Sequence, residues 1–362
     1  MLRFPGAVSF ICIFLIWSKS PICQAQLPAS FIFGDSLVDA GNNNNLISLA
    51  KSNYAFNGID FEGGVATGRF CNGRTVTDII GQALGLPFAP AYMDPNTKGT
   101  AILKGVNYAS GGGGILDETG ANFIERISLG TQVQYFAHTR TQLVDLLGEA
   151  ATADLLSKSL ISFTIGANDY LNNYIFPLSP TPALFNPQQF QDRVVSTFRK
   201  HLIDVYNLGA RKFVVAAVGP LGCIPYQLTF NLREGGSCAP RVNNLIMNFN
   251  KAASEMVLEL GSSLPGANFV FADSYKVVFD IVNNPQAYGF QTADTACCGA
   301  VGPYAGLIPC FPLSPVCPDR SISFFWDPYH PSDAGNVILG NKFLDGDLTD
   351  AYPMNIRQLV SL

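Results

Sequence analysis

The chain alternates short, continuously apolar segments with longer segments that have helical periodicity. The apolar segments are rich in β-branched and aromatic residues, as is typical of strands that are buried on both faces. They lie at residues 30–33, 105–109, 160–165, 212–218 and 267–272, and the helical segments lie at 74–84, 131–147, 187–207 and 241–260. This alternation predicts an α/β fold with a mostly parallel central sheet and helices on both of its faces.

Composition limits both the number of domains and the class of partner. Hydrophobic residues make up 48% of the 362 residues, which is enough for a large core, and no linker or internal repeat interrupts the chain. We therefore expect one domain over residues 26–362. The net charge of −5 does not provide the basic face of a nucleic-acid-binding protein. Three histidines leave little room for a multi-histidine metal site.

Residues 1–25 have the pattern of a secretory signal peptide. Arg3 precedes an apolar run from Ala7 to Trp17, and a polar stretch follows and ends at Ala25. The apolar run is shorter than the about 20 residues that span a bilayer. A signal anchor that stays attached is the alternative. We expect cleavage after Ala25, secretion into the extracellular space and no stable membrane insertion.

Seven cysteines remain after the signal, and an oxidising compartment favours disulfides over zinc ligation. The adjacent residues Cys297 and Cys298 are not expected to bond to each other, so each reaches another cysteine. Cys223 and Cys238 are a plausible local pair. Because seven is an odd number, one thiol is expected to be free, and the isolated Cys71 is our prediction for it.

Polar or glycine-rich turns follow several of the predicted strands. In open parallel sheets, ligands bind at the carboxyl ends of the strands. The turns lie at 34–37, 107–112 and 166–169 and, after a late apolar run at 322–326, at 327–330. We expect these four turns to meet at one edge of the sheet and to carry the chemistry.

His330 is the strongest candidate for a general base. It follows the late apolar run and precedes a helix expected from Pro331, whereas His138 and His201 lie within amphipathic helical segments. Asp327, three residues upstream, is close enough in a turn to bond one imidazole nitrogen while the other faces a serine. The alternative for Asp327 is a carboxylate that caps a turn or a helix.

Ser36, directly after the first strand, is the candidate nucleophile, and its neighbour Asp35 is expected to hold the turn. The pattern G-x-S-x-G is absent, which argues against the nucleophile elbow of α/β-hydrolases. The glycines at 111–114 would let the backbone approach a substrate and donate an N–H, although a flexible turn is the alternative. The side-chain amide of Asn168 is a further candidate donor, with a turn asparagine as the alternative. Together these residues predict ester hydrolysis by a serine.

The sequence resembles the GDSL esterase/lipase family of plants, a branch of the SGNH hydrolases. Four blocks carry the resemblance: FIFGDSLVDAGNNN at 31–44, GVNYASGGGGIL at 105–116, TIGANDYLNNY at 164–174 and FWDPYHPSD at 325–333. The resemblance extends from about Ala29 to Leu359. It implies a three-layer α/β/α sandwich of the flavodoxin-like kind. It also implies a carboxylic ester hydrolase that acts on a small-molecule or lipid ester, with no metal or organic cofactor. For a secreted plant protein, it implies a location in the apoplast or cell wall.

The same resemblance implies a role for each block residue. Ser36 would be the nucleophile, His330 the base, and Asp327 the carboxylate that orients the base. Three groups would donate hydrogen bonds to the oxyanion: the backbone N–H of Ser36, the backbone N–H of Gly112 or of the adjacent Gly111, and the side-chain amide of Asn168.

Two functions other than ester hydrolysis are alternatives for this chain, and they differ in whether they need the same residues. An extracellular acyltransferase of the cutin-synthase-like kind would use the same triad, with an alcohol intercepting the acyl-enzyme in place of water. A non-catalytic secreted binding protein would predict the loss of Ser36, Asp327 or His330, and all three are present. We expect the acyl pocket to be built by the loops at 176–190 and 300–318, whose apolar residues suggest lipidic or aromatic acyl groups.

Overall fold

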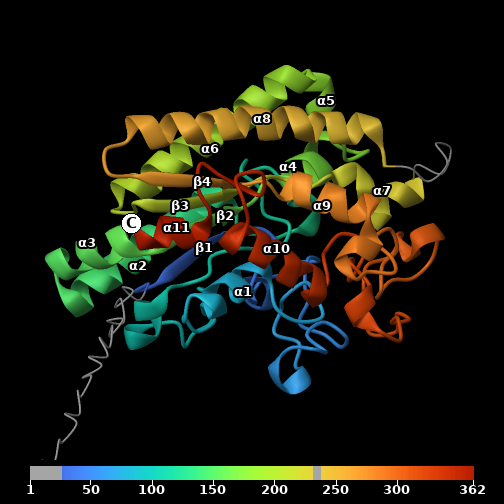
Figure 1. Cartoon of the computed structure of the whole chain (residues 1–362), viewed down its shortest axis with the longest axis horizontal. Helices are drawn as coiled ribbons and strands as arrows, with labels where there is room; N and C mark the ends of the chain where they lie inside the picture. Colours follow the sequence, from blue (N-terminus) through green and yellow to red (C-terminus); the bar gives the residue numbers. More distant parts are fainter. Residues whose placement is uncertain (1–26, 231–237) are drawn as a thin grey trace, which may run out of the picture.

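The computed structural model describes residues 27–230 and 238–362 (Figure 1), so the predicted signal peptide lies outside the described residues. In these ranges the chain forms a five-stranded sheet in the order β1-β2-β3-β4-β5. The strands are β1 (Ser30–Gly34), β2 (Leu160–Thr164), β3 (Lys212–Ala216), β4 (Asn268–Ala272) and β5 (Ala351–Tyr352). The first four are parallel, and β5 is antiparallel to β4. The predicted α/β fold with a mostly parallel sheet is confirmed.

The predicted strand at 105–109 lies beside β1 but forms only an isolated bridge there. The N–H of Ile32 donates to the carbonyl of Val106 (3.0 Å), and the N–H of Tyr108 donates to the carbonyl of Ile32 (2.8 Å). This segment therefore lies on the outer side of β1. Counted with it, the five parallel segments have the 2-1-3-4-5 order of flavodoxin-like folds, and the antiparallel β5 follows as a sixth, outer strand.

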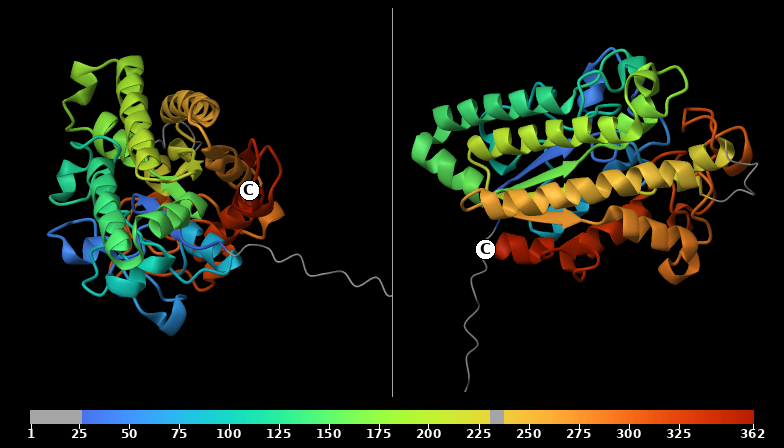
Figure 2. Two further views of the ribbon diagram at one scale, coloured as in Figure 1. Left: turned by 90° about the vertical axis from the view of Figure 1, so that its left-hand side faces the viewer. Right: turned by 90° about the horizontal axis from the view of Figure 1, so that it is seen from above.

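Helices cover both faces of the sheet, as Figure 2 shows. One hydrophobic cluster joins one face to α2 (Leu129–Leu147), α3 (Glu149–Lys158), α6 (Pro187–Asn207) and α8 (Pro240–Ser263). A second cluster joins the opposite face to α1 (Val76–Ala83), α9 (Ser274–Asn283), α10 (Asp333–Asp345) and α11 (Ile356–Ser361). Three short helices lie among the turns: α4 (Ala167–Asp169), α5 (Thr181–Leu184) and α7 (Pro225–Phe230).

The boundaries of the predicted helices agree closely with α1, α2, α6 and α8. Helix α6 illustrates the local cause, because Asn186 and Gln189 form a capping box and Pro187 occupies the first turn. It ends before Gly209, whose φ of +116° leaves the helical region. Among the described residues, no helix is both long and apolar enough to cross a bilayer.

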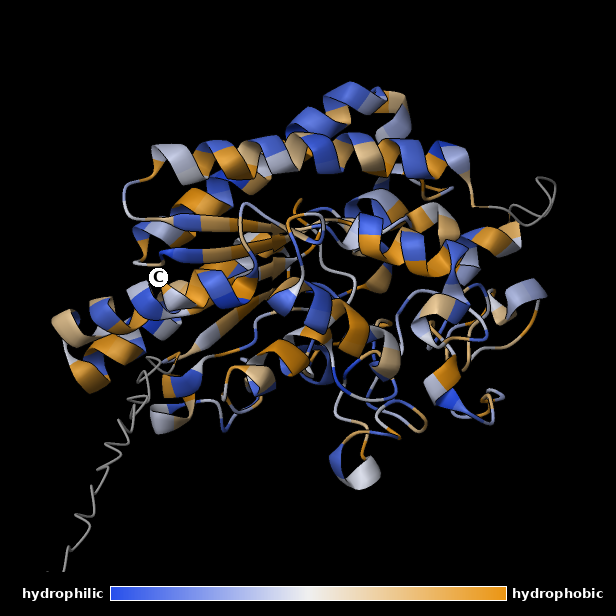
Figure 3. Ribbon diagram, in the orientation of Figure 1, coloured by the Kyte–Doolittle hydropathy of each residue, from blue (hydrophilic) through white to orange (hydrophobic). Residues whose placement is uncertain are grey.

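The two faces of the sheet differ in side-chain size. Phenylalanines fill the face toward α2, α6 and α8, and they stack in pairs such as Phe33 with Phe163, whose ring centroids are 4.7 Å apart. The opposite face carries small side chains at the centre of the sheet, including Ser162, Ala216 and Ala272. The strands themselves are predominantly hydrophobic, whereas hydrophobic and hydrophilic residues alternate along the helices (Figure 3).

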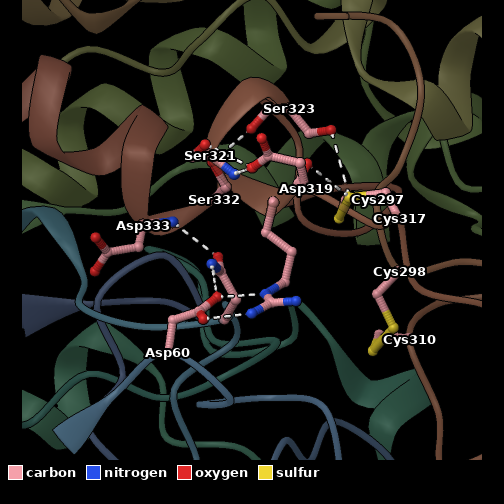
Figure 4. Close-up of a disulfide and its surroundings, with 12 residues drawn as sticks. Asp60, Cys297, Cys298, Cys310, Cys317, Asp319, Ser321, Ser323, Ser332 and Asp333 are labelled. Atoms are coloured by element: carbon pink, nitrogen blue, oxygen red, sulfur yellow. Dashed lines mark hydrogen bonds and ion pairs between the residues drawn. A yellow bond between two sulfur atoms is a disulfide. The ribbon is translucent and has the colours of Figure 1, made fainter.

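Three disulfides connect cysteines of the described residues: Cys223–Cys238, Cys297–Cys317 and Cys298–Cys310. The local pair is confirmed, the two adjacent cysteines bond elsewhere as predicted, and Cys71 is free and buried. Figure 4 shows the two disulfides of the 297–317 loop beside the ion pair that Asp60 makes with Arg320 (2.6 Å). The two disulfides therefore close this loop on itself, and the ion pair joins Arg320, three residues after the loop, to Asp60.

Candidate active site

The four predicted turns meet at the carboxyl edge of the sheet. Ser36, Gly112, Asn168, Asp327 and His330 all line one cavity of about 230 Å³. Ser36 follows β1, and Asn168 belongs to α4, which follows β2. Because parallel strands end at the same edge, residues far apart in the sequence are brought together there.

Three side chains in this cavity form a continuous hydrogen-bonded series. The Nε2 atom of His330 lies 2.7 Å from the Oγ atom of Ser36. Its Nδ1 atom lies 2.8 Å from Oδ2 and 2.9 Å from Oδ1 of Asp327. Both Asp327 and His330 are buried. With Nδ1 protonated toward the carboxylate, Nε2 is free to accept the proton of the serine hydroxyl.

The turn that carries Asp327 and His330 is held by its own backbone. The Oδ1 atom of Asp327 accepts the N–H groups of Tyr329 and His330, both at 2.8 Å. The N–H of Trp326 donates to the carbonyl of His330 (2.8 Å). The carboxylate therefore fixes both the turn and the imidazole that the turn presents.

The late apolar run at 322–326, which precedes the turn of Asp327 and His330, is not a strand of the sheet. Its backbone instead pairs with the disulfide loop: the N–H of Cys297 donates to Phe325 (3.1 Å), and that of Cys298 donates to Trp326 (2.6 Å). Trp326 is fully buried, and its ring N–H donates to Asn57 (2.9 Å). The position beside β4 is taken by β5, so the run finds its hydrogen bonds outside the sheet.

The two candidate glycine donors differ in what their N–H groups contact. The N–H of Gly111 donates to Oδ2 of Asp39 (3.0 Å), whereas that of Gly112 has no acceptor within the described residues. Gly112 lines the cavity, and Gly111 does not. Gly112 has a φ of +78°, and an added Cβ would lie 2.5 Å from the ring of Phe123. This position therefore requires glycine, and the geometry favours Gly112 as the donor.

The amide of Asn168 is oriented by two neighbours. Its Nδ2 atom donates to the carbonyl of Gly113 (2.9 Å), and its Oδ1 atom accepts from Asn172 (2.6 Å). One hydrogen of the amide is used by Gly113, and the other remains for an acceptor in the cavity. The contact also ties the Asn168 turn to the glycine turn.

Two buried carboxylates that the sequence analysis did not select hold the glycine turn. Asp39 accepts the N–H groups of Gly41 (2.7 Å), Asn42 (2.8 Å) and Gly111 (3.0 Å). Asp169 accepts the N–H groups of residues 115 and 116 and the hydroxyl of residue 119. Burial raises the pKa of each carboxyl to about 6. Asp39 lies three positions after Ser36, and Asp169 directly follows Asn168. This closeness to candidate site residues is the sequence signal that could have identified both carboxylates.

Asp35 lies beside the candidate nucleophile and is almost fully buried. Its Oδ1 atom accepts the N–H of Leu37 (3.0 Å), whereas Oδ2 has no partner within the described part of the chain. Desolvation by burial raises the pKa of this carboxyl to about 7, although the Leu37 N–H and the nearby His330 favour the charged form. Asp35 therefore contributes a turn contact at the cost of a desolvated acid.

These buried acids predict that stability falls as the pH rises. Burial raises the pKa of Asp35 to about 7 and the pKa values of Asp39 and Asp169 to about 6, whereas the ordinary pKa of an exposed aspartate is 3.8. Between pH 3.8 and about pH 7, the folded chain thus binds more protons than the unfolded chain. The stabilisation from these protons is complete below pH 3.8 and is lost as the pH rises through the folded-state pKa values of about 6 to 7. We expect Asp35→Asn to flatten this slope in thermal unfolding between pH 4 and pH 8.

The control for this pH series is Asp145→Asn, which changes an exposed carboxylate on α2. It should leave the slope of stability against pH as in the parent protein. Identical slopes for the parent and for Asp35→Asn would contradict the prediction.

The surroundings of the cavity differ from the expected acyl pocket. Of the two loops at 176–190 and 300–318, only Pro309 lines the cavity, so the expectation that they build the pocket is wrong. Its apolar lining instead includes Phe70, Phe123 and Leu171, together with Leu49 at an exposed rim. No cluster of three or more His, Cys, Asp or Glu side chains suited to a metal ion occurs within residues 27–230 and 238–362.

Comparison with known proteins gives one consistent family. The model of the GDSL-like lipase/acylhydrolase family matches residues 31–343. Two GDSL esterase/lipases of Arabidopsis thaliana are each 46% identical, one over 98% of both chains and the other over 99% of this chain and 97% of its own length. Among solved structures, a catalytic mutant of an acetylxylan esterase from Geobacillus stearothermophilus is 14% identical, with a TM-score of 0.42 over 88% of this chain and 93% of that one.

Proposed function

Since the chain belongs to the GDSL-like lipase/acylhydrolase family and is a carboxylic ester hydrolase, we propose that it acts through a triad of Ser36, His330 and Asp327. The observation that carries the proposal is the series of contacts from Oγ through the imidazole to the carboxylate, within one cavity. This arrangement satisfies the requirements for an activated serine: a base within hydrogen-bond reach and a group that orients the base.

The reaction would proceed in two steps through an acyl-enzyme. In the first step, Oγ of Ser36 attacks the ester carbonyl carbon while Nε2 of His330 takes the hydroxyl proton. The tetrahedral intermediate collapses, the bond to the alcohol oxygen breaks, and the imidazolium gives its proton to the leaving alcohol. In the second step, His330 takes a proton from water as the water attacks the acyl carbon, and the same proton then returns to Oγ.

The oxyanion of each tetrahedral intermediate would be held by three donors: the N–H of Ser36, the N–H of Gly112 and the second amide hydrogen of Asn168. The assignment of Gly112 is supported by the contact that already occupies the N–H of Gly111. Asp39 would fix the glycine turn so that the free N–H points into the cavity. Such preorganised donors act without reorganisation during the reaction and are worth a factor of about 10² to 10³ each in kcat.

We further propose that residues 26–362 form one secreted catalytic domain, released by cleavage of the signal at residues 1–25. The composition of that segment supports removal, and the three disulfides support an oxidising compartment outside the cytosol. The substrate would be a small-molecule or lipid ester in that compartment.

The experiment that tests the function is hydrolysis of p-nitrophenyl esters by the secreted protein, with product analysis in the presence and absence of an added primary alcohol. We expect free acid as the main product, together with labelling of the peptide that contains Ser36 by a fluorophosphonate. A new ester formed in place of the acid would favour the acyltransferase. Absence of both turnover and labelling in a folded sample would overturn the proposal.

A further inference from the structure

A second cavity, of about 110 Å³, lies between the sheet and the helices α1 and α10. Its floor is the sheet face that carries small side chains, and its walls include Ile80 of α1 and Leu339 and Phe343 of α10. The proposed catalytic residues do not line it. We refer to it as the chamber.

The chamber exists because of the unequal side-chain sizes on the two sheet faces. On the filled face, phenylalanines from neighbouring strands stack directly, as Phe213 does on Phe269 with ring centroids 4.3 Å apart. On the chamber face, Ser162, Ala216 and Ala272 occupy positions where larger side chains would fill the space. The hydroxyl of Ser162 is buried and has no hydrogen-bond partner among the described residues. Apolar cavities of comparable size remain dry and take up apolar molecules.

The chamber and the catalytic cavity share lining residues. Leu37, Ala167, Leu221 and Tyr329 line both. Leu37 directly follows Ser36, Ala167 directly precedes Asn168, and Tyr329 directly precedes His330. The mouth of the chamber is therefore bordered by the chain neighbours of the proposed nucleophile, oxyanion donor and base.

We propose that the chamber receives the acyl chain of the ester, an inference that rests on the proposed function. The acyl group stays on Ser36 after the alcohol leaves, so an enclosed site suits the acyl chain and a site open to solvent suits the alcohol. The chamber is lined mainly by buried residues, whereas the rim of the catalytic cavity includes the exposed Leu49 and Pro309. In this arrangement the acyl chain lies along the sheet face, from Thr164 toward Leu160.

This path sets the class of substrate. Thr164 and Leu160 both line the chamber and lie four residues apart on β2, which corresponds to about 13 Å of strand. The path from the catalytic cavity into the chamber therefore suits an unbranched acyl chain of medium length, whose distal methylenes occupy the about 110 Å³ of the chamber. Each buried methylene adds to binding. The enzyme is therefore expected to prefer medium-chain acyl esters over acetyl esters and over bulky aromatic acyl groups.

The test is to fill the chamber and measure how the preference for acyl-chain length changes. Gly219 lines the chamber, and an added Cβ there meets no heavy atom within 4 Å. Gly219→Leu is expected to lower kcat/KM for an octanoyl ester by at least about tenfold, because several methylenes lose their site. The acetyl ester should change less than about twofold, because the triad is unaltered.

Gly81→Leu is the matched control. An added Cβ at Gly81, on α1, also meets no heavy atom within 4 Å, and Gly81 lines neither cavity. It should keep the chain-length profile of the parent. Ser162→Leu fills the chamber farther from its mouth, so it should spare the butanoyl ester and reduce the octanoyl and dodecanoyl esters. Thermal unfolding of each variant shows whether it is folded.

The possible outcomes separate the chamber from the proposed function. If the parent protein does not hydrolyse the acetyl ester or any longer one, the proposed function fails. If the parent is active but Gly219→Leu and Gly81→Leu have the same chain-length profile, the chamber proposal is overturned while the triad stands. The last measurement compares the parent and Gly219→Leu with a series of acetate esters whose alcohol groups increase in length. Selective loss of the long alcohols in Gly219→Leu would place the alcohol in the chamber and also overturn the proposal.

Discussion

Ser36→Ala is expected to lower kcat for ester hydrolysis by about 10⁶-fold, as loss of the nucleophile does in a serine protease. The Oγ atom that the substitution removes lies 2.7 Å from Nε2 of His330, and no other atom of the alanine can form the acyl-enzyme. The remaining activity would come from the oxyanion donors and from binding alone. The measurement is kcat with a p-nitrophenyl ester, together with circular dichroism to show that the fold is intact.

Two further variants test whether the loss of activity in Ser36→Ala is specific to the nucleophile. Ser262→Ala changes an exposed serine on α8 and should keep the activity of the parent. The double variant Ser36→Ala/His330→Ala should be no slower than either single variant, because residues that act as a unit have non-additive effects. Retention of more than about 1% of the activity by folded Ser36→Ala would mean that another group is the nucleophile.

Asp327→Asn is expected to lower kcat by about 10⁴-fold with little change in the fold. The two oxygens of Asp327 accept from Nδ1 of His330 and from two backbone N–H groups. An amide in this place keeps one acceptor and gains a donor. If the acceptor remains with the backbone, the NH₂ group faces Nδ1 and the proton moves to Nε2, which then cannot accept the proton of Ser36.

The matched control is Asp319→Asn. Asp319 is exposed, and it accepts the N–H and the hydroxyl of Ser321 in a similar local turn, but no histidine contacts it. This variant should retain nearly full activity. A folded Asp327→Asn variant within about tenfold of the parent would show that the carboxylate does not set the protonation of the imidazole.

The strands that carry the proposed site were predictable because their signal is local. Each is a short apolar run that ends at a glycine or a polar turn. The observed ends of β1, β2, β3 and β4 lie within two residues of the predicted ends. The errors arose where pairing decides the structure. The run at 322–326 has the composition of a strand, but it pairs with Cys297 and Cys298. Strand β5 consists of two residues, too few to show a period.

The residues of the candidate site could be selected from the sequence, but their individual contacts could not. Spacing indicated Asp327 and His330 as candidates because they share one turn. The choice between Gly111 and Gly112 depends on Asp39, which is 72 residues away from Gly111 in the sequence. The chamber was missed for a similar reason. Four strands contribute one or two small side chains each, and no single segment of the sequence reveals the space they leave together.

The separation of Ser36 and His330 along the chain has a consequence for biosynthesis. The proposed nucleophile lies near the start of the described chain and its base lies 294 residues later, although the two atoms are in contact. On the ribosome, all four parallel strands are complete at Ala272, before His330 is made. A nascent or truncated polypeptide can thus contain the serine and most of the sheet and still be unable to cleave an ester. If Ser36 and His330 act together as proposed, catalysis begins only after the segment around His330 has docked beside Ser36, so the onset of activity would report the folding of this late segment.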